Sequence, residues 1–353
     1  MNPLDRACLF ALAGLAVLLA GCTTLLGPSV EYPAIVPVPG SGEPLYAAET
    51  FRFEDGTVTV GINIDAGVYQ GAKRTNREVL LRAPVPEEEW VAGHYLAQIA
   101  DPAQDRFWTD LVGAFRTERE RLGLDDDRYL ELIATAVQQL PYESEPETAS
   151  RFPIETWGDR AGDCDDRSLL LAGLLAREGY RVALLAFLPE GHMAVGIGCA
   201  PEYAYNGTGY AYLEATNTTF VGVVPPGLAG GERPVAPPLV IPVGRGERDY
   251  GAADETAAIA EAVRSARARA EELGREIDLR RAALDRDRER LEGLQGAGDP
   301  VAFETGRDRY RADAAAVARL VEEHNRLVGL VNHCLSHGFD RVGTAAYVSA
   351  HRV

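Results

Sequence analysis

Residues 162–178 read GDCDDRSLLLAGLLARE, a polar start followed by an almost wholly apolar run. The spacing of the leucines and alanines predicts a helix over residues 163–178 that is apolar on nearly all sides and is therefore buried. Gly179 follows at once, and glycine favours the left-handed backbone conformation that ends many helices. The stretch thus predicts a central buried helix with Cys164 at its N-terminal end.

The residues at the start of this helix indicate a reactive thiol. A cysteine at a helix N-terminus faces unpaired backbone N–H groups and the positive end of the helix dipole, and both favour the nucleophilic thiolate over the thiol. The neighbouring Asp165 and Asp166 oppose this, because negative charge raises the pKa of a thiol. We therefore expect an imidazolium beside Cys164, while Asp163 is expected to cap the helix.

Strands predicted after the helix supply that imidazole. They are expected at residues 181–188, 192–199 and 209–216, with a fourth short strand at 219–224. If the second and third strands pair in antiparallel fashion about residue 203, His192 lies opposite Glu214, with Cβ atoms about 5 Å apart. A carboxylate there would hold the imidazole in one tautomer and stabilise its charged form. The alternation places the opposite, core-facing side at Met193, Val195 and Ile197.

Upstream of the central helix, the pattern first predicts a hairpin and then helices. Residues 49–64 alternate between apolar and polar side chains around an Asp55-Gly56 turn, which is typical of a β-hairpin. Residues 86–140 then indicate three helical pieces, of which 127–140 has the clearest apolar stripe. Pro141 is expected to stop that helix.

Downstream, residues 225–244 contain six prolines, which indicates a domain boundary. Heptad stripes then run through residues 253–295 and, after a break at Gly296–Pro300, through residues 310–335. Two such helices joined by a short turn predict an antiparallel coiled-coil hairpin. Each arm would reach on the order of 50–60 Å at about 1.5 Å per residue. The hairpin is a candidate surface for a protein partner.

The N-terminus has the pattern of an export signal. Residues 9–20 are apolar but too short for a comfortable membrane span, and they lead into Leu19-Ala20-Gly21-Cys22. This end resembles the lipobox of prokaryotic lipoproteins, which implies removal of residues 1–21 and lipidation of Cys22. An uncleaved anchor with an incidental cysteine is the alternative. Both interpretations place the rest of the chain outside the cytoplasm and tethered to the cell membrane.

Composition narrows the classes of partner and cofactor. The formal net charge is −18 and the pI is about 4.8, so the surface repels phosphate backbones, and we expect no nucleic acid partner. Apart from Cys8 and Cys22, the cysteines are Cys164, Cys199 and Cys334. Because three cysteines without a CxxC pair make neither a disulfide framework nor a metal site, we expect no metal and no cofactor. An odd thiol in an exported protein fits a catalytic role.

Three stretches together resemble one family. GDCDDRSLLLAGLLAREGYRVALLAF at 162–187, GHMAVGIG at 191–198 and YAYLEATNT at 210–218 resemble the transglutaminase-like superfamily of papain-fold thiol enzymes. The resemblance is strongest to its archaeal members, with their GDCED-type, HMAVG-type and YYYLETT-type motifs. It covers roughly residues 125–224, and the three motifs occur in the family's order.

The resemblance implies an α+β fold with a papain-like core, in which the cysteine helix packs against an antiparallel sheet. It implies Cys164 as nucleophile, His192 as general base and acid, and Glu214 as the orienting acid. Asp165 replaces a commoner Glu, and Glu214 stands where many relatives have Asp. After the acid strand the chain lacks the Gly-Trp expected from the family, so the rim of the substrate site is expected to differ from that of the relatives.

Two further residues have alternative roles. The backbone N–H of Cys164 is one expected oxyanion donor, and the indole N–H of Trp157 could supply another or wall the site. Trp157 could equally be a core residue. Asp166 could pair with Arg160 or Arg167, or could shape the substrate pocket.

The predicted organisation follows from these patterns. It comprises a signal peptide at 1–21, a Pro/Gly-rich tether at 22–47, a transglutaminase-like domain at 48–225 with its core at 125–224, a Pro-rich linker at 226–252, the helical hairpin at 253–340 and a C-terminal tail at 341–353.

Three functions fit the sequence. The first is a cysteine peptidase or amidase that hydrolyses a peptide or other amide bond through an acyl-enzyme on Cys164. The second is an acyl transferase that passes the acyl group to an amine and so crosslinks proteins. The third is a non-catalytic surface scaffold that binds a partner through the hairpin.

Overall fold

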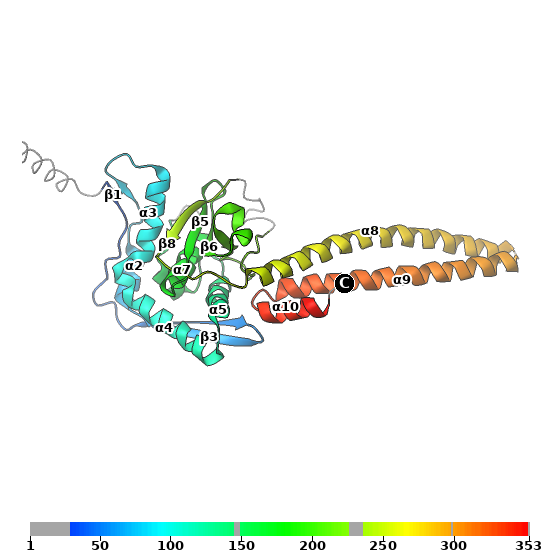
Figure 1. Cartoon of the computed structure of the whole chain (residues 1–353), viewed down its shortest axis with the longest axis horizontal. Helices are drawn as coiled ribbons and strands as arrows, with labels where there is room; N and C mark the ends of the chain where they lie inside the picture. Colours follow the sequence, from blue (N-terminus) through cyan, green and yellow to red (C-terminus); the bar gives the residue numbers. More distant parts are fainter. Residues whose placement is uncertain (1–28, 145–148, 226–235, 298, 352–353) are drawn as a thin grey trace, which may run out of the picture.

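Helices and an antiparallel sheet form the N-terminal part of the chain, and two long helices project from it (Figure 1). This computed structural model describes residues 29–144, 149–225, 236–297 and 299–351. The predicted signal peptide and Cys22 lie outside the described residues. The predicted α+β class is confirmed at this level.

A four-stranded antiparallel sheet lies at the centre of the N-terminal part, in the order β7-β6-β5-β8. Its strands are β5 (Val182–Phe187), β6 (His192–Gly198), β7 (Tyr210–Leu213) and β8 (Leu239–Val243). The three strands predicted after the cysteine helix are therefore confirmed. The fourth, predicted at 219–224, is wrong: these residues form no strand.

The fourth strand comes instead from the segment predicted to be a linker. β8 pairs with the outer side of β5, so that Ile241 lies opposite Leu184 and Pro242 opposite Ala183. A proline within a strand is tolerated at an edge, because the missing N–H then breaks no ladder on a second side. The sheet domain consequently extends beyond residue 225, and β8 forms one edge of the sheet.

The helix α7 (Cys164–Arg177) covers one face of this sheet, as predicted, and its residues Leu169–Leu175 are wholly buried. The core-facing side of β6 is also as predicted, since Met193, Val195 and Ile197 belong to the same main apolar core. A smaller apolar cluster on the opposite face contains Leu185, Phe187, Ala194 and Tyr212. Because both faces are covered, β5 and β6 are buried along their whole length.

The N-terminal hairpin consists of β2 (Leu45–Phe53) and β3 (Gly56–Ile64). Phe53 pairs with Gly56, so the two turn residues are Glu54 and Asp55 rather than the predicted Asp55 and Gly56. Glu54 adopts the left-handed conformation with φ of 52°. The register is nevertheless the one that buries the alternating apolar side chains on the core side.

The three helices predicted over residues 86–140 are confirmed. They are α3 (Glu87–Ala100), α4 (Asp105–Leu122) and α5 (Asp126–Gln138). Two shorter helices add to them, α2 (Ala66–Arg74) and α6 (Pro153–Asp159). α6 and α5 pack directly against α7, and thus support the helix that begins at Cys164.

The predicted tether is wrong for its described part, residues 29–47, because these residues pack on the domain. β1 (Val30–Glu31) pairs with β4 (Leu80–Leu81). Ile35 is buried, and its backbone N–H donates to the Asp101 carboxylate at 2.7 Å. A backbone donor satisfied in this way fixes the segment in place, which a composition rich in proline and glycine does not reveal.

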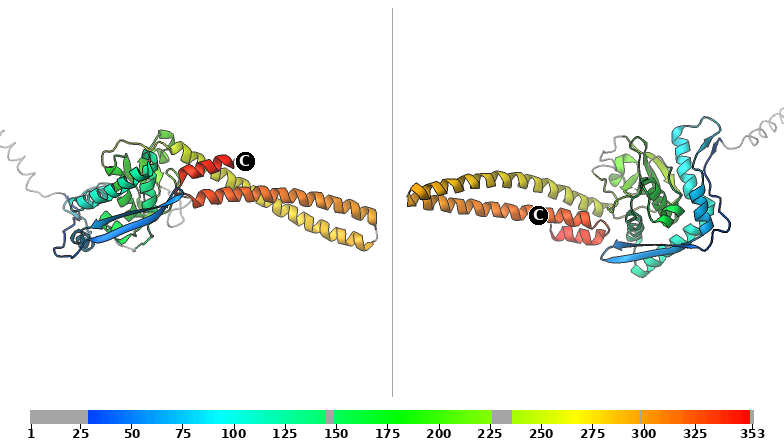
Figure 2. Two further views of the ribbon diagram at one scale, coloured as in Figure 1. Left: turned by 90° about the horizontal axis from the view of Figure 1, so that it is seen from below. Right: turned by 180° about the vertical axis from the view of Figure 1, so that it is seen from behind.

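The long helices α8 (Ala253–Ala297) and α9 (Pro300–Ser336) run antiparallel, as the heptad pattern predicts (Figure 2). α8 is about 65 Å long at 1.5 Å per residue. The buried contacts use the predicted stripe, with Ile259, Ala266, Leu273 and Ile277 from α8. The predicted C-terminal tail contains a further helix, α10 (Arg341–Ala350), which lies against both long helices.

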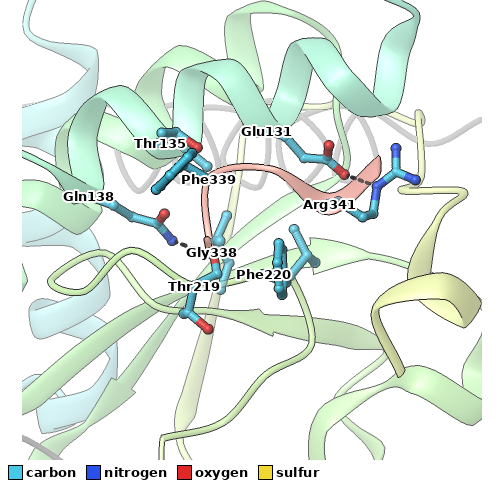
Figure 3. A pocket seen from close by; sticks show the side chains of 11 residues that line it. Glu131, Thr135, Gln138, Thr219, Phe220, Gly338, Phe339 and Arg341 are labelled. Carbon is cyan, nitrogen blue, oxygen red and sulfur yellow. Dashed lines mark hydrogen bonds and ion pairs between the residues drawn. The ribbon is translucent and has the colours of Figure 1, made fainter. Parts of the chain in front are cut away.

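A cluster of charges fastens this hairpin to the core at its root (Figure 3). Arg341, at the start of α10, donates to Glu131 of α5 at 2.5 Å and also pairs with Glu255 of α8. Tyr250 donates a second 2.5 Å hydrogen bond to the same Glu131 carboxylate. Burial raises the pKa of Glu131, and the nearby Arg341 charge opposes that rise.

Replacing Arg341 by methionine is therefore expected to lower the free energy of unfolding by about 3 kcal/mol, because the mostly buried Glu131 is left without its cation. Urea denaturation of both proteins measures the change. Arg280→Met is the matched control on α8, since Arg280 and Glu276 form an exposed pair worth about 0.5 kcal/mol. Equal losses in the two variants would contradict the role given to Arg341.

Candidate active site

The start of α7 is built as a reciprocal cap, and this fixes the backbone at Cys164. The Asp163 carboxylate accepts from the backbone N–H groups of Asp165 and Asp166 at 3.1 and 3.2 Å. The Asp166 carboxylate accepts in turn from the Asp163 N–H at 3.3 Å. This is a capping box made of two aspartates, and Asp163 has the capping position expected for it.

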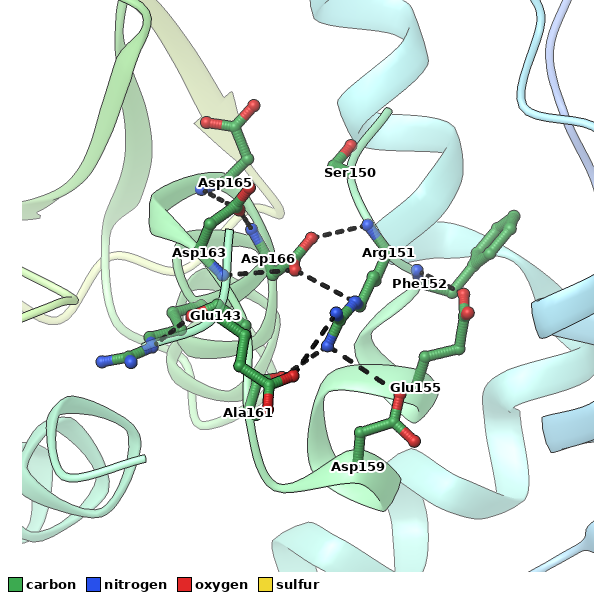
Figure 4. A network of polar contacts seen from close by, with 12 residues as sticks. Glu143, Ser150, Arg151, Phe152, Glu155, Asp159, Ala161, Asp163, Asp165 and Asp166 are labelled. Atoms are coloured by element: carbon green, nitrogen blue, oxygen red, sulfur yellow. Dashed lines mark hydrogen bonds and ion pairs between the residues drawn. The ribbon is translucent and has the colours of Figure 1, made fainter. Parts of the chain in front are cut away.

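Asp166 also joins the helix start to the segment that precedes α6 (Figure 4). Its carboxylate accepts from the Arg151 backbone N–H at 2.6 Å and lies 3.5 Å from the Arg151 guanidinium. Its partner is therefore Arg151, and the structure shows no such pair with Arg160 or Arg167 among the described residues. Burial and the charge of Asp163 raise the pKa of Asp166 to about 6, against the opposing effect of Arg151.

The Cys164 sulfur lies against the residues on both sides of His192. Sγ is 3.9 Å from the Gly191 carbonyl oxygen, and the Met193 backbone N–H is directed at it. Ser168, one turn further along α7, donates to the Met193 carbonyl at 3.2 Å and ties the helix to β6. The cysteine helix and the histidine strand are thus joined at the point where each begins.

The surroundings of Cys164 favour the neutral thiol over the thiolate. Its side chain is buried, and the Asp165 carboxylate lies 3.5 Å from the sulfur. Burial raises the pKa of Cys164 most, and the charges of Asp165 and Asp163 raise it further, while the Met193 N–H opposes them only in part. Any nucleophilic role of this cysteine therefore needs a base that takes its proton.

His192 and Glu214 lie together at the sheet beside the cysteine helix, both with side chains only 2% exposed. His192 Nε2 is 3.5 Å from Glu214 Oε2. The Tyr212 hydroxyl lies between them, 3.2 Å from His192 Nε2 and 2.7 Å from Glu214 Oε2. The other ring nitrogen, Nδ1, is buried and has no hydrogen-bond partner within the described residues.

The strand register differs from the predicted one by two residues. Val195 pairs with Leu213 and Gly196 with Tyr212, so Glu214 lies beyond the end of β7 and not directly opposite His192. A shift of two residues keeps each side chain on its face, because side chains alternate with a period of two. The carboxylate of Glu214 therefore still reaches the imidazole.

Glu214 is held as an anion by the residues that follow it. Its Oε1 accepts from the backbone N–H groups of Ala215 and Thr216 at 3.0 and 2.9 Å and from the Thr216 hydroxyl at 2.6 Å. Burial alone would raise the pKa of Glu214, but the nearby His192 imidazole and the hydrogen bonds from Thr216 and Tyr212 lower it to about 2.

The root of the hairpin contacts the segment that follows this carboxylate. Gln138, at the end of α5, donates to the backbone carbonyls of Glu214 and Thr219 at 2.8 and 3.1 Å. Gln138 and Thr219 line a small cavity together with Gly338, in the turn between α9 and α10 (Figure 3). A side chain at Gly338 would meet the Thr218 carbonyl oxygen at 2.5 Å. The hairpin therefore packs on the chain that positions the acid.

Trp157 lies wholly inside the main core and makes an edge contact with Phe115 at 6.0 Å between ring centroids. Its indole N–H has no hydrogen-bond partner within the described part of the chain. This burial agrees with the core alternative for Trp157.

Three site residues were not singled out from the sequence. The buried Arg167 donates to the carbonyls of Gly162 and Thr216 at 2.9 and 3.3 Å, and so links the cysteine loop to the acid loop. The Tyr95 hydroxyl, from α3, donates to Asp165 at 3.2 Å. Tyr212 shares the face of His192 and Glu214, and the strand alternation could have identified it.

No helix in the described ranges is long and apolar enough to cross a membrane. Over the same residues, no three His, Cys, Asp or Glu side chains gather in a group that could hold a metal ion. Comparisons with models of known protein families, with curated proteins and with solved structures found no match.

Proposed function

We propose that the protein is a thiol hydrolase of the transglutaminase-like type, which cleaves peptide or other amide bonds through an acyl-enzyme on Cys164. The observation that carries this proposal is the buried His192–Glu214 pair, whose histidine lies between two residues that contact Cys164 at the start of a helix. The papain-like nature of the core is part of the same proposal. It is supported by the succession of cysteine helix, histidine strand and acid-bearing chain across one antiparallel sheet.

The chemistry begins with a neutral thiol. His192 Nδ1 accepts the thiol proton as the sulfur attacks the amide carbonyl carbon, forming the C–S bond and moving an electron pair onto the carbonyl oxygen. The oxyanion returns its electrons, the C–N bond breaks, and the imidazolium protonates the leaving amine. Water then attacks the thioester, with His192 again taking a proton, and the carboxylic acid and thiol are released.

The charge that develops on the substrate oxygen needs hydrogen-bond donors. Cys164 is the first residue of α7, so its backbone N–H has no intrahelical acceptor. A preorganised donor of this kind contributes typically about a hundredfold to a thousandfold in turnover. The same N–H lies beside the attacking sulfur, which suits the geometry of an acyl-transfer site.

The test uses the chain from residue 29 onward, since residues 29–44 pack on the domain. Peptide and acyl-amide libraries are profiled with Cys164→Ala as the control, and iodoacetamide labelling is mapped by mass spectrometry. We expect turnover that is absent in Cys164→Ala, and labelling of Cys164 ahead of the buried Cys199 and Cys334. If there is no turnover and no selective labelling of Cys164, the hydrolase is rejected and the scaffold function is favoured.

A second arm separates hydrolysis from transfer. A primary amine is added at increasing concentration, and the products are analysed for an amine conjugate. Hydrolysis predicts the free acid throughout, whereas acyl transfer predicts a conjugate that grows with the amine. A dominant conjugate would replace the proposed hydrolase by an acyl transferase on the same three residues.

A further inference from the structure

The contact between His192 and Glu214 passes through a third residue. The direct separation of Nε2 and Oε2 is 3.5 Å, beyond the 2.7–3.2 Å usual for an N–H···O hydrogen bond. Both contacts of the Tyr212 hydroxyl fall in the normal range, at 3.2 Å to His192 Nε2 and 2.7 Å to Glu214 Oε2. The hydroxyl is thus the group through which the two are hydrogen-bonded.

The number of protons available fixes the direction of these bonds. Oε1 of Glu214 accepts from two backbone N–H groups and the Thr216 hydroxyl, which favours the carboxylate, so the Glu214 oxygens accept and Tyr212 uses its single O–H to donate to Oε2. Burial and the Glu214 charge raise the pKa of Tyr212, so the phenol keeps that proton. The hydroxyl oxygen can then only accept from His192, which requires a proton on Nε2.

We propose that Tyr212 is a positioning residue of the site: its hydroxyl sets the Nε2–H tautomer of His192 and leaves Nδ1 as the base for the Cys164 thiol. The inference rests on the proposed thiol chemistry for its consequence but not for its geometry. Nδ1 is the nitrogen without a hydrogen-bond partner within the described residues, and its lone pair is the one that this tautomer exposes. The bridging hydroxyl also links the imidazolium that forms during the reaction to the Glu214 carboxylate, whose negative charge stabilises it.

The aromatic side chains around Tyr212 hold the relay in place. The Phe187 ring lies 6.1 Å from the His192 ring and 6.4 Å from the Tyr212 ring, between centroids. Tyr205 lies 5.5 Å from Tyr212 and packs on the same cluster. Tyr212 itself is only 1% exposed. Water therefore has little access to replace the hydroxyl, and a phenylalanine at this position fits the same apolar space.

Tyr212→Phe removes only the hydroxyl, and Tyr205→Phe is the matched control from the same aromatic cluster. The first readout is the ¹⁵N NMR spectrum of His192, whose two ring-nitrogen shifts report the tautomer directly. We expect wild type and Tyr205→Phe to show the Nε2–H form. We expect Tyr212→Phe to show a mixture with the Nδ1–H form.

The second readout is kinetic. We expect kcat in Tyr212→Phe to fall by about tenfold to a hundredfold, because a smaller fraction of His192 is in the tautomer that can accept the thiol proton. KM should stay nearly unchanged, because the binding surface is intact. Alkylation of Cys164 is also expected to require a higher pH in this variant.

The tautomer measurement separates the two proposals. A wild-type spectrum with the proton on Nδ1, or a Tyr212→Phe spectrum identical to wild type, overturns the role of Tyr212 whatever the activity. An Nε2–H spectrum that Tyr212→Phe disturbs, without turnover in any variant, supports the role and rejects the hydrolase. Because the wild-type spectrum alone can contradict the proposal, the test does not depend on the folding of the variant.

Discussion

Replacing His192 by alanine is expected to lower the turnover of amide substrates by about a thousandfold or more. Cys164 is buried beside Asp165, and burial and this charge raise its pKa, so the thiolate is disfavoured near neutral pH without a base. The helix end does not compensate, since Asp163 also raises that pKa. His192 is the candidate base, because the residues on both sides of it, Gly191 and Met193, contact the sulfur through their backbone.

The same substitution should raise the pH at which iodoacetamide modifies Cys164. This rate is measured over a range of pH and needs no substrate, so it tests the thiol–imidazole pair by itself. Glu214→Gln should have a smaller effect than His192→Ala on turnover, because it removes orientation but leaves the base. His324→Ala, at the partly buried contact between α8 and α9, is the control for loss of a histidine elsewhere. An alkylation profile unchanged in His192→Ala would remove the histidine from the mechanism.

The parts of the fold that the sequence predicts best are those with strong local patterns. The central helix at 163–178 and the strand at 192–199 are apolar almost throughout, and they form α7 and β6 within one or two residues. The positions of Cys164 and His192 were predictable as well, because helix capping places Cys164 at the start of the helix and strand alternation sets the face of His192. The functional roles of these residues stay predictions.

The parts that were missed depend on partners distant in the chain. β8 forms because residues 239–243 complete an edge of β5, more than fifty residues earlier, and the surrounding prolines hide that pairing. The pairing between β6 and β7 shifted by two residues because turn geometry fixes register, and the loop between them contains short helical turns. Strand alternation puts Tyr212 on the same face as Glu214, but only the atomic distances show that its hydroxyl contacts both His192 and Glu214.

The free energy of unfolding is expected to depend on pH through the ionisation of Glu214. The folded protein lowers the pKa of Glu214 from 4.5 to about 2, because the nearby His192 imidazole and the Thr216 hydrogen bond outweigh the effect of burial. The unfolded chain therefore binds this proton at a higher pH than the folded protein does. The stabilisation is fully present above about pH 4.5 and is lost as the pH falls from there toward 2. Its full size is about 3 kcal/mol, since one pKa unit corresponds to about 1.4 kcal/mol.

Glu214→Gln keeps the size of the side chain but cannot ionise, so it isolates this contribution. The free energy of unfolding from urea titrations is expected to be about 3 kcal/mol lower in the variant at pH 7. The difference should shrink steadily between pH 4.5 and pH 2. Asp166, whose pKa is raised to about 6, acts in the opposite direction, but it is present in both proteins and largely cancels in the difference.

Glu322→Gln, on the exposed surface of α9, controls for the substitution itself. A stability difference for Glu214→Gln that stays constant from pH 7 to pH 3 would show that the carboxylate is not held as an anion. The direction of the Tyr212 hydrogen bond would then lose its basis as well, because a protonated Glu214 could donate to the hydroxyl. A difference that declines with acid instead supports both the ionised acid and the proton order along Glu214, Tyr212 and His192.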